Sequence, residues 1–372
     1  MRLLIASDRL DELSGGVTYV LTVAEQLQRL GHEVWLHAPG APGEGAEARR
    51  RGLRVAADPA DLAEPPELVY AQDAASAYTA ADAWPSVPQV FCVHSDDWDL
   101  SLPPQVQDVV AAVVALHGRV EARARAAAVV PEVVRLTQPI DVTRFRPVTP
   151  LADPPERVLL VSNYVTGDRT SLVEAACAAA GLSLRCIGRA FGTATATDHQ
   201  LYEQCDIVLG KARVVLEAMA CGRAAYVYDV NGGDGWVTAE SYGRLEADNF
   251  GGQSRATVTT VESLAGDLRD FRRDMGAANR DLVMAGHQAT KHAEALVDLF
   301  RRVAAEATGP GRGPWLELAR MARLQWDTDR LVGAVAEREA LRAELTRVHA
   351  EYRKVYAELE RVRGTENERE TG

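Results

Sequence analysis

The stretch GKARVVLEAMACGRAAYVYD, Gly210 to Asp229, decides the fold of this chain. A short apolar run of strand length, Ile207–Leu209, leads into it, and another, Ala224–Tyr228, lies at its end. Between them, Val214–Cys221 is a run of helix-forming residues that Gly222 ends. Strand, loop, short helix and strand in this order predict one βαβ unit of a parallel sheet.

Charged residues lie where this predicted helix begins. Lys211 and Arg213 occupy the opening loop, where the free backbone N–H groups of a helix N-terminus favour an anion. Glu217 follows one turn later, at the end of the sheet where open α/β folds bind ligands. A carboxylate beside a phosphate site commonly holds a ribose hydroxyl. The alternative is structural, with Glu217 complementing the helix dipole and the two cations in a solvated turn.

Length and composition limit the classes of protein to consider. With 372 residues, of which 47% are hydrophobic, the chain suits two or three globular domains. Its net charge of −12 argues against a broad nucleic-acid-binding surface but is compatible with a local basic pocket. We expect neither a signal peptide nor a membrane span, because the apolar runs are too short. The cysteines form no CxxC pair and are typical of reduced thiols in a cytoplasmic protein: Cys92, Cys177, Cys186, Cys205 and Cys221.

The N-terminal part of the chain shows a similar alternation of strands and helices. Arg2–Ser7 is an apolar run of strand length, and Asp8–Gly16 is a polar loop that ends in two glycines. Val17–Leu30 has helical spacing and stops at Gly31. Further strand-length runs follow at Glu33–His37, Leu53–Ala56, Leu68–Ala71, Val87–Val93, Ala112–Leu116 and Val133–Leu136. The pattern predicts a doubly wound α/β domain over residues 1–148.

A proline-rich stretch, Arg144–Glu156, separates this domain from a second one. The alternation then restarts, with strands at Arg157–Ser162 and Leu182–Ile187 and helices at Ser171–Ala180 and His199–Gln204. It runs through the opening stretch to a last helix, Ala289–Ala307. We therefore predict a second α/β domain over residues 149–308 and a helical extension over 309–372.

The helical extension has a pattern of its own. Its seam residues recur alternately three and four positions apart, at Leu331, Ala334, Arg338, Leu341, Leu345, Val348, Tyr352, Val355, Leu359 and Val362. This is the a/d seam of a coiled coil, with Arg338 as its one charged member. A helix with one narrow apolar stripe cannot bury that stripe alone, so we expect a homo-oligomer formed through it. The alternative is a helix that lies on the body of the protein.

Taken together, these features resemble the retaining GT-B glycosyltransferases of family four (glycosyl transferases group 1), which use nucleotide-sugar donors. The segments that carry the resemblance are SGGVTYVLTVAEQLQRLGHEVWLHAP (Ser14–Pro39), VPQVFCVHSDD (Val87–Asp97), VVALHGRVEARAR (Val113–Arg125), QPIDVTRFRP (Gln138–Pro147) and LEAMACGRAAYVYD (Leu216–Asp229). The resemblance implies a GT-B fold in which two Rossmann-like doubly wound domains face a cleft. It also implies that the acceptor binds to the first domain and the donor to the second.

The resemblance assigns roles to the residues that match the family's motifs. Gly15 and Gly16 match the glycine loop that approaches the donor diphosphate, where a Cβ would block the backbone; the alternative is a plain turn. His94, at the end of a predicted strand, matches a histidine near sugar and acceptor, although a lone histidine is more often structural. Glu217 matches the ribose-binding carboxylate. His94 and Glu217 are the predicted catalytic residues, and the predicted nucleotide-binding set also includes Val215 and Leu216.

Two departures from the family's pattern concern the donor. Family members usually place an Arg and a Lys just after the first strand of the second domain, where they neutralise the leaving diphosphate. Asn163 stands near the expected Arg, and Arg169 is the candidate for one of the two cations. Lys211 and Arg213 are candidates to compensate. Leu209 stands where the family commonly has a glutamate that contacts hydroxyls of the donor sugar.

Two acidic segments have both functional and structural interpretations. Asn231–Trp236 is Gly-rich, and its Asp234 either replaces the lost hydroxyl contact or belongs to an ordinary loop. Asp96-Asp97-Trp98-Asp99 has the composition of a metal site, but it lies beside His94 in the first domain, so we assign it to the acceptor side or to a solvated loop. The histidines show no metal-ligand spacing. We predict no metal and no cofactor.

The expected activity is that of a metal-independent, hexosyltransferase-type glycosyltransferase. It transfers a sugar, with retention, from a nucleotide-diphosphate sugar to a glycan, lipid-linked or small-molecule acceptor. The alternatives are a nucleotide-sugar epimerase of the same fold and a catalytically degenerate GT-B binding or assembly module. We expect a cytoplasmic protein without a nucleic-acid partner, and leave peripheral membrane association open.

Overall fold

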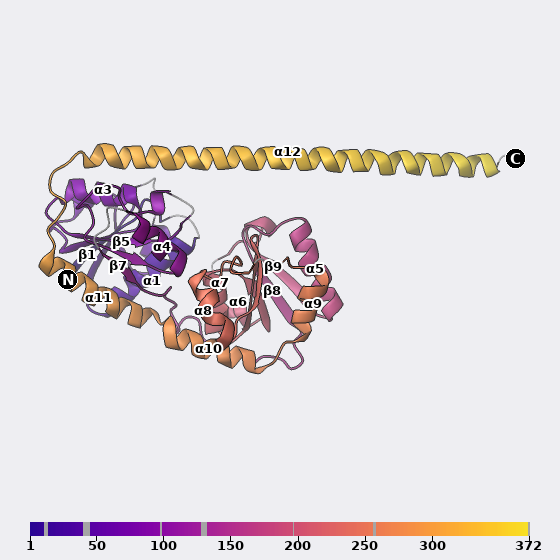
Figure 1. The fold of residues 1–372 in the computed structure, drawn as a ribbon, viewed down its shortest axis with the longest axis horizontal. Helices are drawn as coiled ribbons and strands as arrows, with labels where there is room; N and C mark the ends of the chain where they lie inside the picture. The colour runs from indigo at the N-terminus through magenta and orange to yellow at the C-terminus, as the bar shows by residue number, and fades with distance from the viewer. Residues whose placement is uncertain are drawn as a thin grey trace. The chain divides into compact units, whose positions relative to one another are not determined.

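The computed structural model describes residues 1–10, 14–39, 45–96, 99–127, 132–195, 197–255 and 258–370. Residues Met1–Ala319 form one unit, which holds two β-sheets and the helices around them. Arg320–Gly372 form a second unit, which is helical through Glu370. Figure 1 traces the chain through these elements.

The first sheet has seven parallel strands in the order β3-β2-β1-β4-β5-β6-β7. Strand order reverses between β1 and β4, and such a switch point opens a crevice at the carboxyl ends of the strands. The strands are β1 (Arg2–Ala6), β2 (Glu33–His37), β3 (Arg54–Ala56), β4 (Leu68–Ala71), β5 (Gln89–Val93), β6 (Ala112–Ala115) and β7 (Val133–Arg135). The helices of this part are α1 (Gly15–Arg29), α2 (Ala46–Arg50), α3 (Ala74–Ala83) and α4 (Gly118–Ala126), with short 3₁₀ turns at Pro59–Asp61 and Asp99–Ser101.

The second sheet has five strands in the order β12-β11-β10-β8-β9, and its order reverses between β8 and β10. Its strands are β8 (Arg157–Val161), β9 (Ser183–Ile187), β10 (Ile207–Gly210), β11 (Ala224–Asp229) and β12 (Gly232–Trp236). The helices between them are α5 (Asp168–Ala180), α6 (His199–Tyr202) and α7 (Arg213–Ala220), with a 3₁₀ turn at Arg189–Phe191. The βαβ unit predicted from Gly210–Asp229 is β10-α7-β11, and its two strands pair in parallel.

The Gly-rich run after β11 is a strand, so its interpretation as a loop is wrong. β12 pairs antiparallel with β11, with a register shift between Val227 and Tyr228. A glycine-rich segment lacks the apolar alternation by which strands are recognised, which is why its sequence does not reveal the pairing. Within β12, Asp234 is buried and accepts the backbone N–H groups of Ser254 and Arg255. Its carboxylate therefore holds a loop of its own domain.

The last helix of the predicted second domain returns to the first sheet. α8 (Ala239–Ala247), α9 (Val261–Arg269) and α10 (Asp274–Gly286) follow β12, and α10 packs on α7 and β11. α11 (Ala289–Glu306) instead packs on α1 and β5, as Figure 1 shows. Its Leu296 and Phe300 belong to the same core as Leu3 and Ile5 of β1. The predicted range 149–308 therefore contains a helix that belongs to the core of the first sheet.

A single helix of 56 residues, α12 (Trp315–Glu370), ends the described chain. Its first turn is anchored on the first sheet's helices, because the Trp315 ring stacks over Tyr78 with 6.2 Å between centroids. The side chains of four predicted seam residues lie outside the described part of the structure: Leu341, Val355, Leu359 and Val362. The coiled coil stays a prediction. Across the described ranges, no helix is long and apolar enough to cross a membrane.

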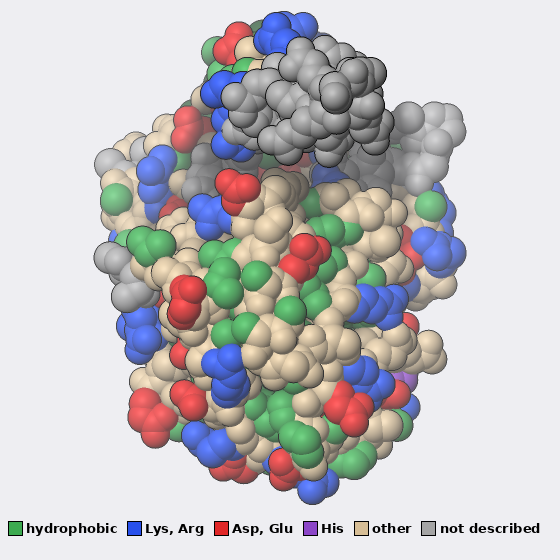
Figure 2. Space-filling view, turned by 90° about the vertical axis from the view of Figure 1, so that its right-hand side faces the viewer, with side chains coloured by type: hydrophobic (Ala, Val, Ile, Leu, Met, Phe, Trp, Pro, Cys, Tyr) green, Lys and Arg blue, Asp and Glu red, His purple; other side chains and the backbone are tan. Residues whose placement is uncertain are grey.

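Basic and acidic side chains are interspersed on the face of the molecule that Figure 2 presents. This face has no broad single-sign patch, in keeping with the net negative charge of the chain.

Candidate functional site

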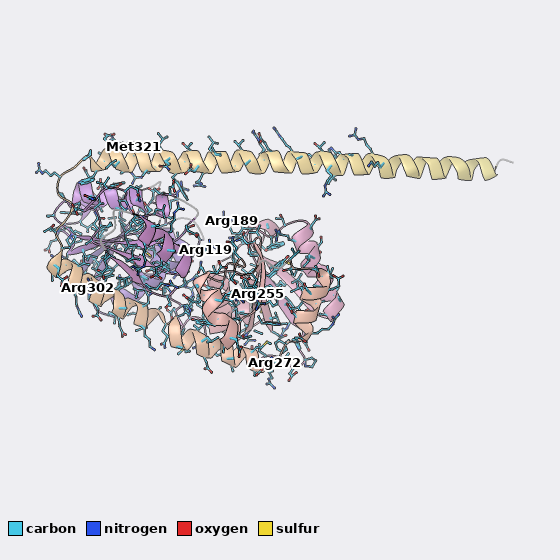
Figure 3. All side chains as sticks on the ribbon, viewed as in Figure 1. Arg119, Arg189, Arg255, Arg272, Arg302 and Met321 are labelled. Carbon is cyan, nitrogen blue, oxygen red and sulfur yellow. The ribbon has the colours of Figure 1, made fainter. Side chains whose placement is uncertain are left out.

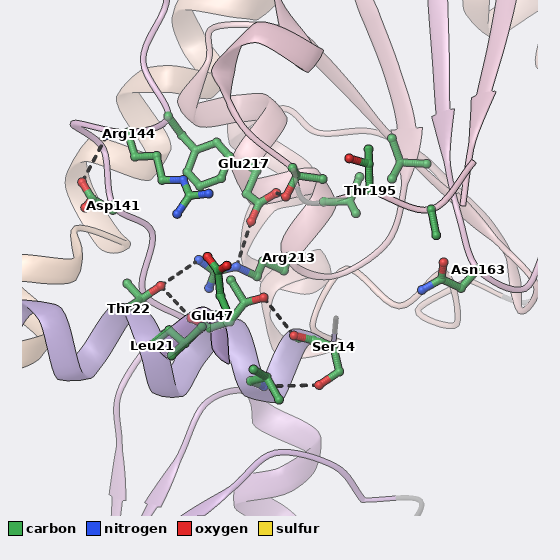
Figure 4. Close-up of a pocket in the computed structure, with 18 of the residues that line it drawn as sticks. Ser14, Leu21, Thr22, Glu47, Asp141, Arg144, Asn163, Thr195, Arg213 and Glu217 are labelled. Carbon is green, nitrogen blue, oxygen red and sulfur yellow. Dashed lines mark hydrogen bonds and ion pairs between the residues drawn. The ribbon is translucent and has the colours of Figure 1, made fainter. Parts of the chain in front are cut away.

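The carboxyl ends of the two sheets meet around a pocket of about 220 Å³ (Figure 4). The start of α1 and part of α2 line it from the first sheet's side, and the segments after β8 and β9 and the first turn of α7 line it from the second. Because α1 follows β1 and α7 follows β10, both switch points open onto this pocket. The pocket is thus where the topology places a ligand.

Glu217 lines the pocket from α7 and is 2% exposed. Its Oε1 accepts Nε of Arg213 at 2.8 Å. Its Oε2 accepts the hydroxyls of Thr197 at 2.7 Å and Tyr202 at 2.9 Å. A carboxylate offers about four lone-pair positions, and three of them are occupied. Among the described residues, no donor takes the remaining position, on Oε1, so Glu217 is both a fixed structural anion and a candidate ribose acceptor.

Arg213 is the first residue of α7 and also lines the pocket, but its guanidinium is buried in protein contacts. Besides the bond to Glu217, it donates to the carbonyl of Pro139 at 2.9 Å and to the hydroxyl of Thr22 at 3.3 Å. Burial lowers the pKa of Arg213, and the charge of Glu217 acts in the opposite direction. Arg213 thereby joins α7 to α1 and to the segment between the domains. The sequence predicted only that Arg213 lies in an anion-binding loop, and did not predict this structural role.

Lys211, the other predicted loop cation, lies outside the lining of this pocket. Its ammonium is 3.2 Å from Oδ1 of Asp229, at the end of β11, and 4.3 Å from the centre of the Tyr164 ring. Asp229 is 1% exposed, so Lys211 neutralises a buried carboxylate. Its role toward a diphosphate stays a prediction.

Gly15 and Gly16 are the first two residues of α1, not part of the preceding loop. Ser14 caps the helix, since its hydroxyl accepts the N–H of Val17 at 3.3 Å. A Cβ on Gly15 would meet nothing within 4 Å, and one on Gly16 would only touch the His94 ring at 3.9 Å. The protein itself therefore does not require glycine here. Among the described residues, no hydrogen bond occupies the N–H groups of Gly15 and Gly16, so this helix end is a candidate position for a ligand anion.

His94 follows β5 and stands next to Gly16, outside the pocket lining. Its Nε2 is 2.9 Å from Oε1 of Gln72, and its ring meets Tyr19 edge-on at 5.0 Å. Burial lowers the pKa of His94 to about 4. The imidazole is neutral at physiological pH, which suits it to hydrogen bonding and makes it a weak base.

Three arginines that the sequence interpretation missed line the pocket: Arg51, which pairs with Glu47, and Arg144 and Arg189. Arg144 stacks over the Phe145 ring at 5.8 Å. Arg189 begins the turn after β9, and its backbone N–H bonds to Oδ1 of Asn163 at 3.0 Å. Within the described part of the chain, the guanidinium groups of Arg144 and Arg189 have no carboxylate partner. The available signal was Gly188-Arg189 directly after a strand, because a βα turn at the sheet's carboxyl end faces the ligand.

Four other predicted positions lie away from the pocket lining. Val215 and Leu216 point into the core beneath α7, and both of their N–H groups already bond to the carbonyl of Ala212. Leu209 is fully buried in the core on the other side of the second sheet, so no sugar contact comes from this position. Arg169 is exposed in the first turn of α5.

The acidic segment beside His94 takes part in a contact between the two α/β parts. Asp96 forms two hydrogen bonds with Arg119, which also bonds to Asp248 of the second part at 3.2 Å. Asp97 and Trp98 lie outside the described residues. No group of three or more His, Cys, Asp or Glu side chains in the described ranges is arranged to hold a metal.

Solved structures identify the architecture. No protein-family model and no curated protein matches this chain. HepE from Anabaena, determined with UDP-glucose, superposes with a TM-score of 0.58 at 11% identity, over 81% of this chain and 100% of HepE. AviGT4, a glycosyltransferase involved in avilamycin A biosynthesis, superposes with a TM-score of 0.50 at 17% identity, over 83% and 99%. The chain has the GT-B fold. In this fold the pocket around Glu217 lies in the cleft between two Rossmann-like domains.

Proposed function

We propose that this protein is a glycosyltransferase that moves a sugar from a nucleotide-diphosphate sugar to an acceptor hydroxyl. The observation that carries the proposal is Glu217, held in the cleft with one free acceptor position and surrounded by a lining that includes Arg144 and Arg189. A carboxylate for ribose and cations for phosphates are what a nucleotide diphosphate requires. The complex of the similarly folded HepE with UDP-glucose supports the same donor class.

The donor diphosphate is proposed to lie between the N-terminus of α1 and the two arginines. Gly15 and Gly16 each offer a backbone N–H at a helix end, where the dipole favours negative charge. Arg144 and Arg189 supply fixed positive charge to the leaving diphosphate. These groups take the part that a metal plays elsewhere, so we propose a reaction without metal or cofactor.

Transfer is proposed to proceed with retention, as the family resemblance implies. The bond from the anomeric carbon to the donor phosphate breaks, and the acceptor oxygen bonds to that carbon on the same face. The proton of the acceptor passes to the departing phosphate oxygen. His94, neutral beside Gly16, contributes hydrogen bonding and not proton abstraction.

The acceptor is proposed to bind on the first domain's side of the pocket. Glu25, Glu47 and Arg51 line that side, and Arg51 lies 2.8 Å from Glu47 and 3.6 Å from Glu25. Burial raises the pKa of Glu25. A wall of hydrogen-bonding groups suits a hydroxyl-rich glycan, a lipid-linked sugar or a small polar molecule.

The test is incubation of the protein with UDP-, GDP-, dTDP- and ADP-hexoses and a set of acceptors, followed by mass and NMR analysis of the products. We expect a glycoside that keeps the anomeric configuration of the donor, formed equally well with a chelator present. An inverted product overturns retention. A changed sugar without an acceptor product indicates an epimerase, and the absence of any conversion or nucleotide binding indicates a degenerate module.

A matched pair of variants ties this activity to the site. Glu217→Gln removes the carboxylate in the pocket, whereas Glu262→Gln changes an exposed glutamate on α9 of the same domain. We expect the first to lower turnover at least a hundredfold and the second to leave it unchanged. Full turnover by a folded Glu217→Gln protein would remove Glu217 from the donor site.

A further inference from the structure

α12 exposes a series of large apolar side chains. Leu324, Leu331, Leu345, Val348 and Tyr352 are between 46% and 68% exposed, and Met321, labelled in Figure 3, is 65% exposed. From Leu331 onward these residues fall on the a and d positions of one heptad series. Val332 and Val335 are exposed as well, so it is the a/d spacing of the larger apolar residues along one continuous helix that indicates an interaction surface.

The charged residues beside this stripe follow the same heptads. With Leu331 at position a, the g positions of four successive heptads are glutamate: Glu337, Glu344, Glu351 and Glu358. The e positions five residues after them are Arg342, His349, Tyr356 and Arg363. Over these heptads one flank of the stripe carries only glutamate, and the other carries two arginines, one histidine and one tyrosine.

From these positions we infer that α12 pairs with α12 of a second copy of this chain, in parallel and in register. A parallel pair brings each g residue next to the e residue of the following heptad on the partner helix. Position 337, a glutamate, then lies next to position 342 of the second copy, an arginine, and the same holds for positions 358 and 363. An antiparallel pair would bring g next to g, and would set the glutamates against one another. The charge pattern therefore selects the orientation.

Arg338 favours an assembly of two α12 helices over one of three or four. Leucine at position a combined with valine at position d is also compatible with bundles of three or four helices. Arg338, however, occupies an a position, and each added helix would add another guanidinium to the same layer. In a pair, this side chain reaches the edge of the interface, where the partner's g residue, glutamate 337 of the second copy, lines the hole that receives it. Two helices are the arrangement that tolerates this residue.

Cysteine cross-linking of the full chain tests the register. Leu331 and Val332 are 65% and 63% exposed, but only Leu331 lies in the stripe, since Val332 falls on position b. We expect Leu331→Cys to form an inter-chain disulfide under mild oxidation, and Val332→Cys and the unchanged chain to form none. An antiparallel pair separates the two Leu331 positions, so equal behaviour of both variants overturns the inference.

Two measurements test the pairing itself: the mass of the protein in solution, and the effect of exchanging the charges at positions 337 and 342. Light scattering should give twice the chain mass of 40.3 kDa, and a monomer, trimer or tetramer contradicts the proposal. Glu337→Arg should weaken dimerisation about fivefold, because two g–e′ pairs become repulsive. Adding Arg342→Glu should restore it. Residues 337 and 342 are not neighbours on one helix, so failure of the second change to restore dimerisation also overturns the parallel register.

Discussion

Nε of Arg213 lies 2.8 Å from Oε1 of Glu217, one turn further along α7, and both side chains are buried in the cleft. The pair anchors two parts of the fold and is also part of the proposed ligand site. Arg213 fixes the carboxylate and ties α7 to Thr22 of the first domain. Glu217 lines the pocket, and among the described residues no donor takes its fourth acceptor position. The contact between the domains and the proposed recognition of the donor therefore involve the same ion pair.

This pair should show strong energetic coupling. Arg213→Met and Glu217→Gln should each lower the free energy of unfolding by about 3–5 kcal/mol, because each leaves a buried charge or its partners unsatisfied. The double variant should lose clearly less than the sum. Urea unfolding of the four proteins gives the coupling energy. The pair Arg125 and Glu121, which has the same spacing but is more exposed, serves as the control, with changes of about 0.5 kcal/mol.

Removing either unpaired guanidinium should impair catalysis without loss of stability. Arg144→Ala and Arg189→Ala should each lower kcat/KM for the donor about 10- to 100-fold, since a hydrogen bond to a charged group contributes about 1.5–3 kcal/mol. Steady-state kinetics measures the effect on catalysis, and thermal unfolding of the same variants measures the effect on stability. Arg185→Ala, on β9 and directed to Gln204, is the matched control. Equal kinetics of Arg189→Ala and Arg185→Ala would contradict the diphosphate role.

The elements of this fold were more predictable from sequence than the contacts of its site. Continuous apolar runs marked the parallel strands, because buried strands need no alternation. The glycines of β12 carry no such signal. Arg213 and Glu217 were recognisable as helix neighbours, but Thr22, Thr197 and Tyr202 reach them only through the tertiary fold. The return of α11 to the first sheet was likewise invisible, since its apolar stripe does not identify its partner.

The free energy of unfolding should decrease on acidification, over a pH range that the buried histidines set. Burial lowers the pKa of His117 and of His287 to about 4 and that of His292 to about 3, against about 6.5 in the unfolded chain. Between these values the unfolded chain binds protons that the folded protein excludes. The free energy of unfolding should therefore decrease below pH 6.5, by about 1.4 kcal/mol per pH unit for each histidine. Asp73, whose pKa burial raises to about 6, opposes part of this trend.

Unfolding by urea at several pH values between 7.5 and 4.5 measures this dependence. His287→Gln should show a shallower fall than the unchanged protein, and the exposed His349→Gln should not differ from it. A stability that is level or rises on acidification would show that these imidazoles are not held neutral.

The turn that carries Arg189 should depend on glycine at position 188. Gly188 has a φ of 145°, and a Cβ there would lie 1.8 Å from the carbonyl oxygen of Ser162. Gly188→Ala should cost about 2–4 kcal/mol of unfolding free energy and weaken donor binding. Gly192, with a φ of 66° and nothing within 4 Å of an added Cβ, is the control, and its alanine variant should cost about 1 kcal/mol. Equal costs would show that the turn is not built on this close approach.

The most direct test of the central claim is calorimetric titration of the protein with UDP, GDP, dTDP and ADP. We expect one of these nucleotides to bind with a stoichiometry of one per chain. We also expect that a folded Glu217→Gln protein binds that nucleotide at least tenfold more weakly, while Glu262→Gln binds it as the unchanged protein does. Binding of none of the four, or equal binding by all three proteins, would contradict the assignment of this cleft to a nucleotide-sugar donor.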